Sequence, residues 1–319
     1  MNRLLIVLGP TSTGKTDLAI SLAKKFDGEL VACDSRQVYK SLDIGTGKLP
    51  GQIVKVKKSK GYWELDGVKI WMYDVADPNK QYTVADYVKD ASRVIEEISN
   101  RKKLPIIVGG TGFYLNVLLE GIPSLTIPIN ISLRKKLEKL SRESLQKKMK
   151  KISPDKWNKL NESDKQNPRR LLRAIEIIMG GQKQKKNNIL DSKLKSWNIL
   201  KIGLTAPRQI LYQRIDERVI SRINQGMITE TKDLHSKGLA LQRMKQLGLE
   251  YGVLADYISG RISDKDELIK ILQNKIHGYA RRQITWFKKE KNIKWFDITD
   301  QNYQSKVVKL MSKWYYMEV

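Results

Sequence analysis

The stretch from Gly9 to Thr16 reads G-P-T-S-T-G-K-T and constrains the fold of this chain more than any other segment. It matches the pattern G-x-x-x-x-G-K-[ST], in which a glycine-rich loop turns backbone N–H groups toward phosphate oxygens. The apolar run Leu4–Leu8 before it predicts a buried strand, and Asp17–Phe26 after it has the apolar spacing of a helix. Strand, loop and helix in this order predict a phosphate site at a helix N-terminus.

The side chains of this loop suit a bound diphosphate. Lys15 supplies a point charge for phosphate oxygens, and Thr16 supplies a hydroxyl suited to Mg²⁺. The loop by itself specifies neither the molecule that carries the phosphates nor whether they are hydrolysed. We expect the following residues to bind the diphosphate, with Thr16 also at a Mg²⁺ site: Gly9, Thr11, Ser12, Thr13, Gly14, Lys15 and Thr16.

The charge of the chain indicates a polyanionic partner. Its 319 residues include 60 Lys and Arg against 34 Asp and Glu, a formal net charge of +26. The segment Ile131–Lys195 holds 20 basic and 7 acidic residues, so half of the excess falls in about a fifth of the chain. General lysine enrichment would spread the charge evenly, so this clustering favours a nucleic-acid surface.

Cysteine and histidine are too few for several kinds of site. Cys33 is the single cysteine, which excludes an internal disulfide, and His235 and His277 are far apart in the sequence. We expect no zinc site and a reducing, cytoplasmic location. No apolar run approaches the length that spans a membrane, so we expect no membrane partner.

Strands alternate with helices in the first part of the chain. Buried strands are predicted at Glu29–Cys33, Leu104–Val108 and Asn198–Leu204. This alternation predicts an α/β fold with a doubly wound parallel sheet, similar to the core of P-loop NTPases. Residues 1–121 and 196–319 would form that core, and the lysine-rich helical segment 122–195 would be an insertion domain.

Several local features refine this outline. Thr83 and Asp86 form a capping box that opens a helix to about Arg101, and Ser263 with Asp266 opens a long helix to about Lys289. The apolar stripe expected on the long helix consists of Leu268, Leu272, Ile276, Tyr279 and Ile284. A single helix is expected over Leu133–Lys151, a polar basic loop over Gln182–Lys195, and only short β-like alternation over Lys55–Tyr73.

Polar residues follow three of the predicted strands. The phosphate loop, Asp34-Ser35 and Gly110-Thr111 each stand at a strand's carboxyl end, and such ends face one crevice in open α/β sheets. Asp34 is therefore a candidate base or metal-shell carboxylate, although an N-capping role would explain it equally well. Arg214, Arg218 and Arg222 recur every four residues and share a helix face, either solvated or directed at a departing diphosphate.

At this point the motifs resemble those of the tRNA dimethylallyltransferase, or tRNA isopentenyltransferase, family. The resemblance runs in order over nearly the whole chain. It is carried by the phosphate loop, Asp34–Lys40 with Leu42–Lys48, Val108–Leu115, Asn167–Arg170 with Arg173–Glu176, Arg214–Arg218, Gln246–Gly248 and Tyr279–Phe287. No C-terminal zinc finger of the eukaryotic members is present, so we expect the shorter bacterial type, acting as a monomer.

The resemblance implies a reaction and its machinery. A dimethylallyl group would move from dimethylallyl diphosphate to the exocyclic amine of the adenosine immediately 3′ of a tRNA anticodon, a base that must be turned out of its stack. Asp34 would be the general base, with Thr111 and Arg218 as further catalytic residues beside the departing diphosphate. The resemblance assigns contacts with tRNA to Asp34, Ser35, Arg36, Gln37, Thr111, Arg134, Gln166, Asn167, Pro168, Arg169, Arg170, Arg243, Lys245, Gln246, Gly248, Arg281 and Arg282.

Three other functions are compatible with parts of the sequence. A small-molecule kinase would use the same loop, but it needs an acidic residue at a strand end that Ile106–Gly110 does not supply. An isopentenyltransferase for free adenine nucleotides has no use for the basic insertion. The third alternative is an RNA-binding module with a relict phosphate loop, which catalyses no reaction. A loss of catalysis when Asp34 is replaced by alanine would exclude it.

Overall fold

The computed structural model describes residues 1–49, 55–181 and 193–316 and divides the chain into two compact units. Unit 1 comprises Met1–Leu119 and Lys193–Val319, and unit 2 comprises Glu120–Ser192. The sequence placed the insertion at 122–195. Most of the expected basic loop over Gln182–Lys195 lies outside the described residues, and Lys193–Ser196 form the short 3₁₀ helix η2.

Unit 1 is built on one eight-stranded sheet with the order β3-β4-β5-β2-β6-β1-β7-β8. Its strands are β1 (Arg3–Leu8), β2 (Gly28–Ala32), β3 (Val56–Ser59), β4 (Tyr62–Leu65), β5 (Val68–Trp71), β6 (Leu104–Gly109), β7 (Asn198–Thr205) and β8 (Ile293–Asp297). The six strands from β5 to β8 in this order are parallel, with Leu5 opposite both Ile106 and Leu200. The central strands are almost continuously buried, as expected for a parallel sheet covered on both faces.

The sheet differs from the expected all-parallel one at its edges. β3, β4 and β5 form an antiparallel meander over Lys55–Tyr73, so the sheet is mixed. The strand patterns in this segment are too short to predict a meander, and its two turns have positive φ values at Gly61 and Gly67. The strand β8 was also missed, because its residues are only partly buried and show no strict alternation.

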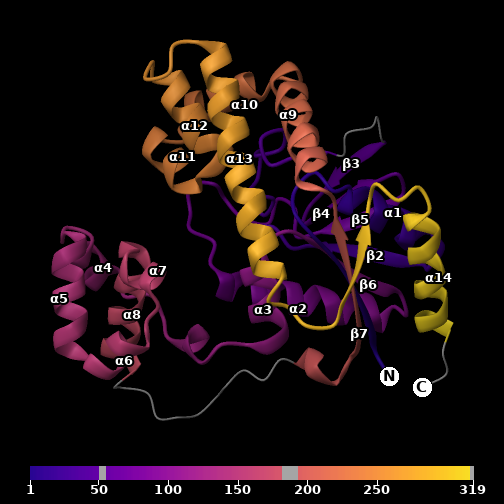
Figure 1. The fold of residues 1–319 in the computed structure, drawn as a ribbon, viewed down its shortest axis with the longest axis horizontal. Helices are drawn as coiled ribbons and strands as arrows, with labels where there is room; N and C mark the ends of the chain where they lie inside the picture. Colours follow the sequence, from indigo (N-terminus) through magenta and orange to yellow (C-terminus); the bar gives the residue numbers. More distant parts are fainter. Residues whose placement is uncertain (50–54, 182–192, 317–319) are drawn as a thin grey trace. The chain divides into compact units, whose positions relative to one another are not determined.

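Helices cover both faces of this sheet (Figure 1). On one side, α1 and α14 come together where the rings of Phe26 and Tyr315 lie 5.4 Å apart; on the other, α2 and α3 meet where Tyr87 stacks on Tyr114 at 4.6 Å. The helices of unit 1 are α1 (Lys15–Lys25), α2 (Val84–Asn100), α3 (Gly112–Glu120, whose last residue belongs to unit 2), α9 (Arg208–Asn224), α10 (Met227–Ser236), α11 (Leu241–Leu247), α12 (Leu249–Ile258), α13 (Lys265–Phe287) and α14 (Tyr303–Tyr316).

A second core forms among the helices that follow β7. Residues of α9, α12 and α13 pack together here, including Leu211, Val253 and Leu272. The capping box of α2 at Thr83 and Asp86 is confirmed. For α13, however, the cap is Asp264, whose carboxylate accepts a hydrogen bond from the backbone N–H of Glu267. Asp is as good an N-cap as Ser and here leaves two acidic residues in the first helical turn.

The buried stripe of α13 also differs from the expected one. Leu268, Leu272 and Ile276 are buried, but the stripe continues through Ala280, Gln283 and Phe287 rather than through Tyr279 and Ile284. The helical period of 3.6 residues carries the line of burial onto these positions. Tyr279 is thereby turned toward the cavity described below.

Unit 2 is helical. Its elements are η1 (Pro123–Thr126), α4 (Ile131–Leu137), α5 (Arg142–Ile152), α6 (Pro154–Lys159), α7 (Glu162–Lys165) and α8 (Pro168–Gly181). The single helix expected over Leu133–Lys151 is wrong, because Ser141 starts a new helix by accepting the backbone N–H of Ser144. A small core of apolar side chains, among them Met149 and Leu171, holds α5 and α8 together.

Candidate active site

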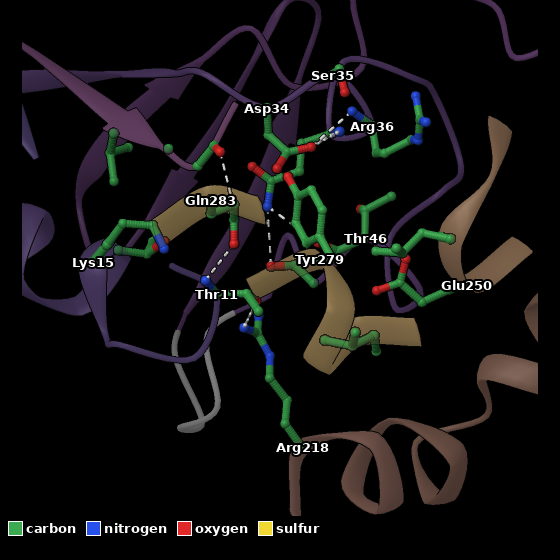
Figure 2. Close-up of a pocket in the computed structure, with 18 of the residues that line it drawn as sticks. Thr11, Lys15, Asp34, Ser35, Arg36, Thr46, Arg218, Glu250, Tyr279 and Gln283 are labelled. Carbon is green, nitrogen blue, oxygen red and sulfur yellow. Dashed lines mark hydrogen bonds between the residues drawn. The ribbon is translucent and has the colours of Figure 1, made fainter. Parts of the chain in front are cut away.

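A cavity of about 330 Å³ opens at the carboxyl edge of the sheet in unit 1. β1, β2 and β6 are parallel neighbours, so the segments that follow them meet there. Figure 2 shows side chains from these segments and from α13 around the same space. Its walls include Thr11, Lys15, Thr16, Asp34, Ser35, Arg36, Gln37, Thr46, Gly47, Arg218, Arg222, Glu250, Tyr279, Arg282 and Gln283.

The phosphate loop is held in the backbone conformation that an anion site requires. Gly9, Ser12 and Gly14 have positive φ values, and Gly14 is the N-cap of α1. A side chain on Gly9 would collide with the carbonyl of Leu204 on β7, so the chain needs glycine there. The hydroxyl of Ser12 is buried without a hydrogen-bond partner, although its residue borders a second hollow beside the loop. An unpartnered buried hydroxyl beside a phosphate loop fits an anionic ligand.

Lys15 is poised to change its charge when an anion binds. Its ammonium donates to the carbonyl of Pro10 at 2.7 Å within the loop. Burial and the nearby Arg218 lower the pKa of Lys15 to about 7, and Asp34 opposes the shift. A bound diphosphate would favour the charged form.

The Asp34 carboxylate lies just beyond the end of β2. Its Oδ1 accepts hydrogen bonds from the backbone N–H groups of Arg36 at 2.8 Å and Gln37 at 3.4 Å. This is the capping contact that the sequence allowed, and the residue lines the cavity as well. The two interpretations of Asp34 are therefore compatible, since one carboxylate oxygen orients the side chain at the cavity wall.

Thr111 joins two of the strand ends. Its hydroxyl accepts the backbone N–H of Ser35 at 3.1 Å, and its own backbone N–H donates to the carbonyl of Cys33 at 3.2 Å. The same hydroxyl contacts Tyr279, whose pKa is raised by burial. Thr111 thus fastens the segment after β6 to the segment after β2.

Gln283 is a site residue to which sequence reasoning gave no role. Its side-chain oxygen accepts the backbone N–H of Thr11 at 2.9 Å, and its side-chain nitrogen donates to the carbonyl of Gly110 at 2.9 Å. A buried glutamine on the apolar stripe of a long helix is the signal that could have identified it. Gln283 thereby fixes α13 to both the phosphate loop and the end of β6.

The loop that follows Asp34 is held by a partly buried carboxylate from α10. Glu230 accepts the backbone N–H groups of Asp43 at 3.0 Å, Ile44 at 2.7 Å and Gly45 at 3.1 Å. This residue was also missed, because its partners lie far from it in the sequence and no local pattern marks it. The loop in turn receives the side-chain amide of Gln37 at the carbonyls of Thr46 and Gly47.

The three arginines of α9 have different surroundings. Arg218 lines the cavity and donates to the Thr11 hydroxyl at 3.4 Å. Arg222 lines the cavity and is 8% exposed, whereas Arg214 borders the neighbouring hollow beside the loop. Burial and the nearby Arg222 lower the pKa of Arg218 to about 9.

Of the other residues of unit 1 that were expected to bind RNA, some make contacts within the protein and others are exposed to solvent. Arg243 donates to the carbonyls of Pro78 at 2.7 Å and Lys80 at 2.6 Å, and Lys245 pairs with Asp256 at 2.9 Å. Gly248 is the N-cap of α12 with a positive φ. Gln246, Arg281 and Arg282 are exposed. On the same helix as Arg281 and Arg282, the exposed ring of Trp286 meets the exposed ring of Phe113 edge to face. Phe287, by contrast, is buried in the core.

In unit 2, too, some of the residues expected to bind RNA make contacts within the protein and others are exposed. Arg134 makes two hydrogen bonds, of 2.8 and 2.9 Å, to the buried carboxylate of Glu176, and Asn167 caps α8 by accepting the backbone N–H of Arg169. Arg170 pairs with Asp164. Gln166, Pro168 and Arg169 are exposed around a hollow at the start of α8.

A Mg²⁺ ion would find hard oxygen ligands in the cavity but no preformed cage. The described residues hold no cluster of three or more His, Cys, Asp or Glu side chains able to bind a metal. Thr16 and Asp34 both line the cavity and carry oxygen donors. Mg²⁺ is commonly bound through one or two protein oxygens together with substrate phosphates, so the residues present fit that ion. Among the helices of the described ranges, none combines the length and apolarity needed to cross a membrane.

Comparison with known proteins gives a consistent result. Residues 37–290 match the family model described as IPP transferase, and residues 2–62 match the one described as isopentenyl transferase. The tRNA dimethylallyltransferase 2 of Treponema denticola is 40% identical over 294 residues, covering 90% of this chain and 92% of its own. The tRNA dimethylallyltransferase of Bacillus mycoides is 34% identical, covering 96% and 93%.

A solved structure agrees in fold. The full-length tRNA isopentenylpyrophosphate transferase of Bacillus halodurans is 32% identical, with a TM-score of 0.69. The alignment covers 98% of this chain and 95% of that one.

Proposed function

The chain belongs to the IPP transferase family, and on that premise we propose that it transfers a dimethylallyl group from dimethylallyl diphosphate to the exocyclic amine of the adenosine immediately 3′ of a tRNA anticodon. Prenyl transfer to tRNA is the activity named for the relatives above. The observation that carries the proposal is the single cavity in which the phosphate loop and Asp34 face the same space (Figure 2).

Asp34 is the general base of this proposal. An exocyclic adenine amine is a poor nucleophile because its lone pair is delocalised into the ring. As its nitrogen bonds to the allylic carbon, the carbon–oxygen bond to the diphosphate breaks and the amine proton passes to an Asp34 oxygen. The backbone contacts of Oδ1 with Arg36 and Gln37 support this role, since they orient the carboxylate.

The leaving diphosphate is stabilised where its charge develops. Backbone N–H groups of the loop, the Lys15 ammonium and the Arg218 guanidinium supply the donors. Mg²⁺ at the Thr16 hydroxyl would, when bound, neutralise part of the diphosphate charge. Thr111 stands at the joint between the two strand ends and keeps Asp34 and the diphosphate site together.

Binding of tRNA uses the exposed basic residues. Arg169, Arg281 and Arg282 are free to contact phosphates, with the aromatic pair near Arg282 available for stacking. Arg134 and Arg243 act indirectly, because their guanidinium groups hold other parts of the fold. Ser35, Arg36 and Gln37 line the cavity and would meet the extruded base.

The test mixes the protein with Mg²⁺, labelled dimethylallyl diphosphate and an anticodon stem-loop, and measures label in the RNA. We expect label in the RNA and no ATP hydrolysis in a parallel assay. ATP turnover without labelled RNA would favour the kinase alternative. The end of β6 counts against that alternative, because the strand ends at Gly109 and is followed by Gly110, with no acidic residue there. Label on free adenosine monophosphate instead of the stem-loop would favour the nucleotide-modifying alternative.

A further inference from the structure

Arg222, which is buried, and Arg218, which is partly buried, bring two guanidinium groups to one point of the cavity wall. They lie one helical turn apart on α9, and both line the cavity. A Cβ atom on Gly47 would collide with the terminal nitrogens of both side chains, so the two groups lie side by side against that glycine. Adjacent buried cations repel each other, and an anion between them relieves the repulsion.

The counter-ion available within the fold is insufficient. Arg222 donates to the carbonyl of Gly45 at 3.2 Å and to the carboxylate of Glu250 at 3.4 Å, which is a long ion pair. Glu250 also lines the cavity, and burial raises its pKa, which shows that Arg222 does not fully offset its desolvation. Both hydrogen bonds of the Arg222 guanidinium are therefore at the long end of the usual range.

The side chains that line the cavity carry more positive than negative charge. Five cationic side chains line it against two carboxylates, a formal excess of three positive charges. The cations are Lys15, Arg36, Arg218, Arg222 and Arg282, and the carboxylates are Asp34 and Glu250. An excess of this size matches the charge of a diphosphate.

We propose that Arg222 is a second arginine that binds the leaving diphosphate beside Arg218, and that Glu250 is the counter-ion that holds Arg222 until the diphosphate arrives. The inference rests on the proposed function and adds to it a cation that the sequence motifs did not assign. When the diphosphate binds, the Arg222 fork turns from Glu250 to a phosphate oxygen, a shorter and better charge-assisted hydrogen bond. Arg218 and Arg222 then neutralise the charge that the departing group acquires.

A purely structural role for the pair makes different predictions. If Arg222 only anchored Glu250 and Gly45, loss of either partner would loosen the site, and removal of both charges would restore binding. If Arg222 contacts the diphosphate, Glu250 competes for it, so loss of the carboxylate improves binding. The sign of the Glu250 effect therefore separates the two roles.

The experiment titrates inorganic pyrophosphate with Mg²⁺ into the full chain by calorimetry. We expect Arg222→Gln to weaken binding by about 10- to 100-fold and Glu250→Gln to tighten it by about 3- to 10-fold, the range of charge-assisted hydrogen bonds. The double variant should bind about as weakly as Arg222→Gln. Arg208→Gln removes an exposed arginine from the first turn of the same helix and should leave the affinity unchanged.

The outcomes are distinct from those of the proposed function, because pyrophosphate binding requires neither prenyl transfer nor RNA. Unchanged affinity in Arg222→Gln, weaker binding in Glu250→Gln, or wild-type affinity in the double variant would each overturn the inference. Arg222→Lys keeps the charge but not the fork and should bind more weakly than the wild type. This variant and the sign of the Glu250 effect decide the matter if Arg222→Gln does not fold. A wild-type chain that binds pyrophosphate but transfers no prenyl group would contradict the function and leave the inference standing.

Discussion

The Glu230 carboxylate accepts a hydrogen bond of 2.6 Å from the hydroxyl of Tyr251, so α10 and α12 are joined beside the loop that follows Asp34. The same carboxylate receives three successive backbone N–H groups, from Asp43 to Gly45. Tyr251 also lies against Gly45, where a Cβ atom would come within 2.7 Å of its hydroxyl oxygen. One side chain therefore fixes the loop whose next residues, Thr46 and Gly47, line the cavity.

Glu230→Gln should destabilise the protein and weaken pyrophosphate binding. The amide cannot accept at both ends, so at least one of the buried N–H or O–H donors loses its partner, at a cost of about 1–3 kcal/mol. Chemical denaturation measures that loss in the free energy of unfolding. Asp233→Asn is the matched control, because it neutralises an exposed carboxylate one turn along α10 and should change neither quantity appreciably. Equal behaviour of the two variants would contradict the anchoring role.

The affinity for pyrophosphate should fall as the pH rises above about 7. Burial lowers the pKa of Lys15 to about 7 in the free protein, so its ammonium loses its proton above that pH. A bound anion raises this pKa, and binding must then take up a proton. Calorimetry at pH 8 in buffers of different ionisation enthalpy measures the uptake. Lys15→Met should bind weakly at every pH and show less uptake, whereas unchanged uptake in that variant would exclude Lys15 as its source.

Salt should weaken stem-loop binding more steeply than dimethylallyl diphosphate binding. The RNA would meet exposed arginines, and each phosphate contact adds about 0.7 to 0.9 to the logarithmic salt slope. The enclosed cavity is less accessible to screening ions. Titrations of both substrates over a range of KCl concentrations give the two slopes. Arg169→Gln and Arg281→Gln should each reduce the RNA slope by about one, and equal slopes for both substrates would contradict the assignment.

The local parts of the site were predictable from the sequence because their signals are local. The strand, glycine-rich loop and helix around Lys15 follow one another directly, and the apolar run from Leu30 to Cys33 directly precedes Asp34. The parallel order of β1, β2 and β6 then brings their ends together. The capping box at Thr83 needed only four residues of sequence.

The contacts that complete the site depend on tertiary packing. Glu230 binds the loop at Gly45 across 185 residues, and Gln283 reaches Thr11 across 272, so no spacing rule connects them. The same holds for Arg222, which in the sequence could equally be a solvated arginine. The new helix start at Ser141 and the cap at Asp264 were missed for another reason. Neighbouring polar residues, such as Ser263 and Asp264, are both good N-caps, and helix propensity alone does not show which of them begins the helix.

The most direct test of the account compares prenyl transfer by the wild type with transfer by Asp34→Asn. The asparagine keeps a side-chain oxygen for the backbone N–H groups of Arg36 and Gln37 but cannot accept the amine proton. We predict a loss of single-turnover transfer to the anticodon stem-loop of at least about 100-fold, with the dissociation constants of the stem-loop and of pyrophosphate changed by less than about threefold. Transfer at a rate near that of the wild type would contradict the assignment of Asp34 as the base, and with it the mechanism.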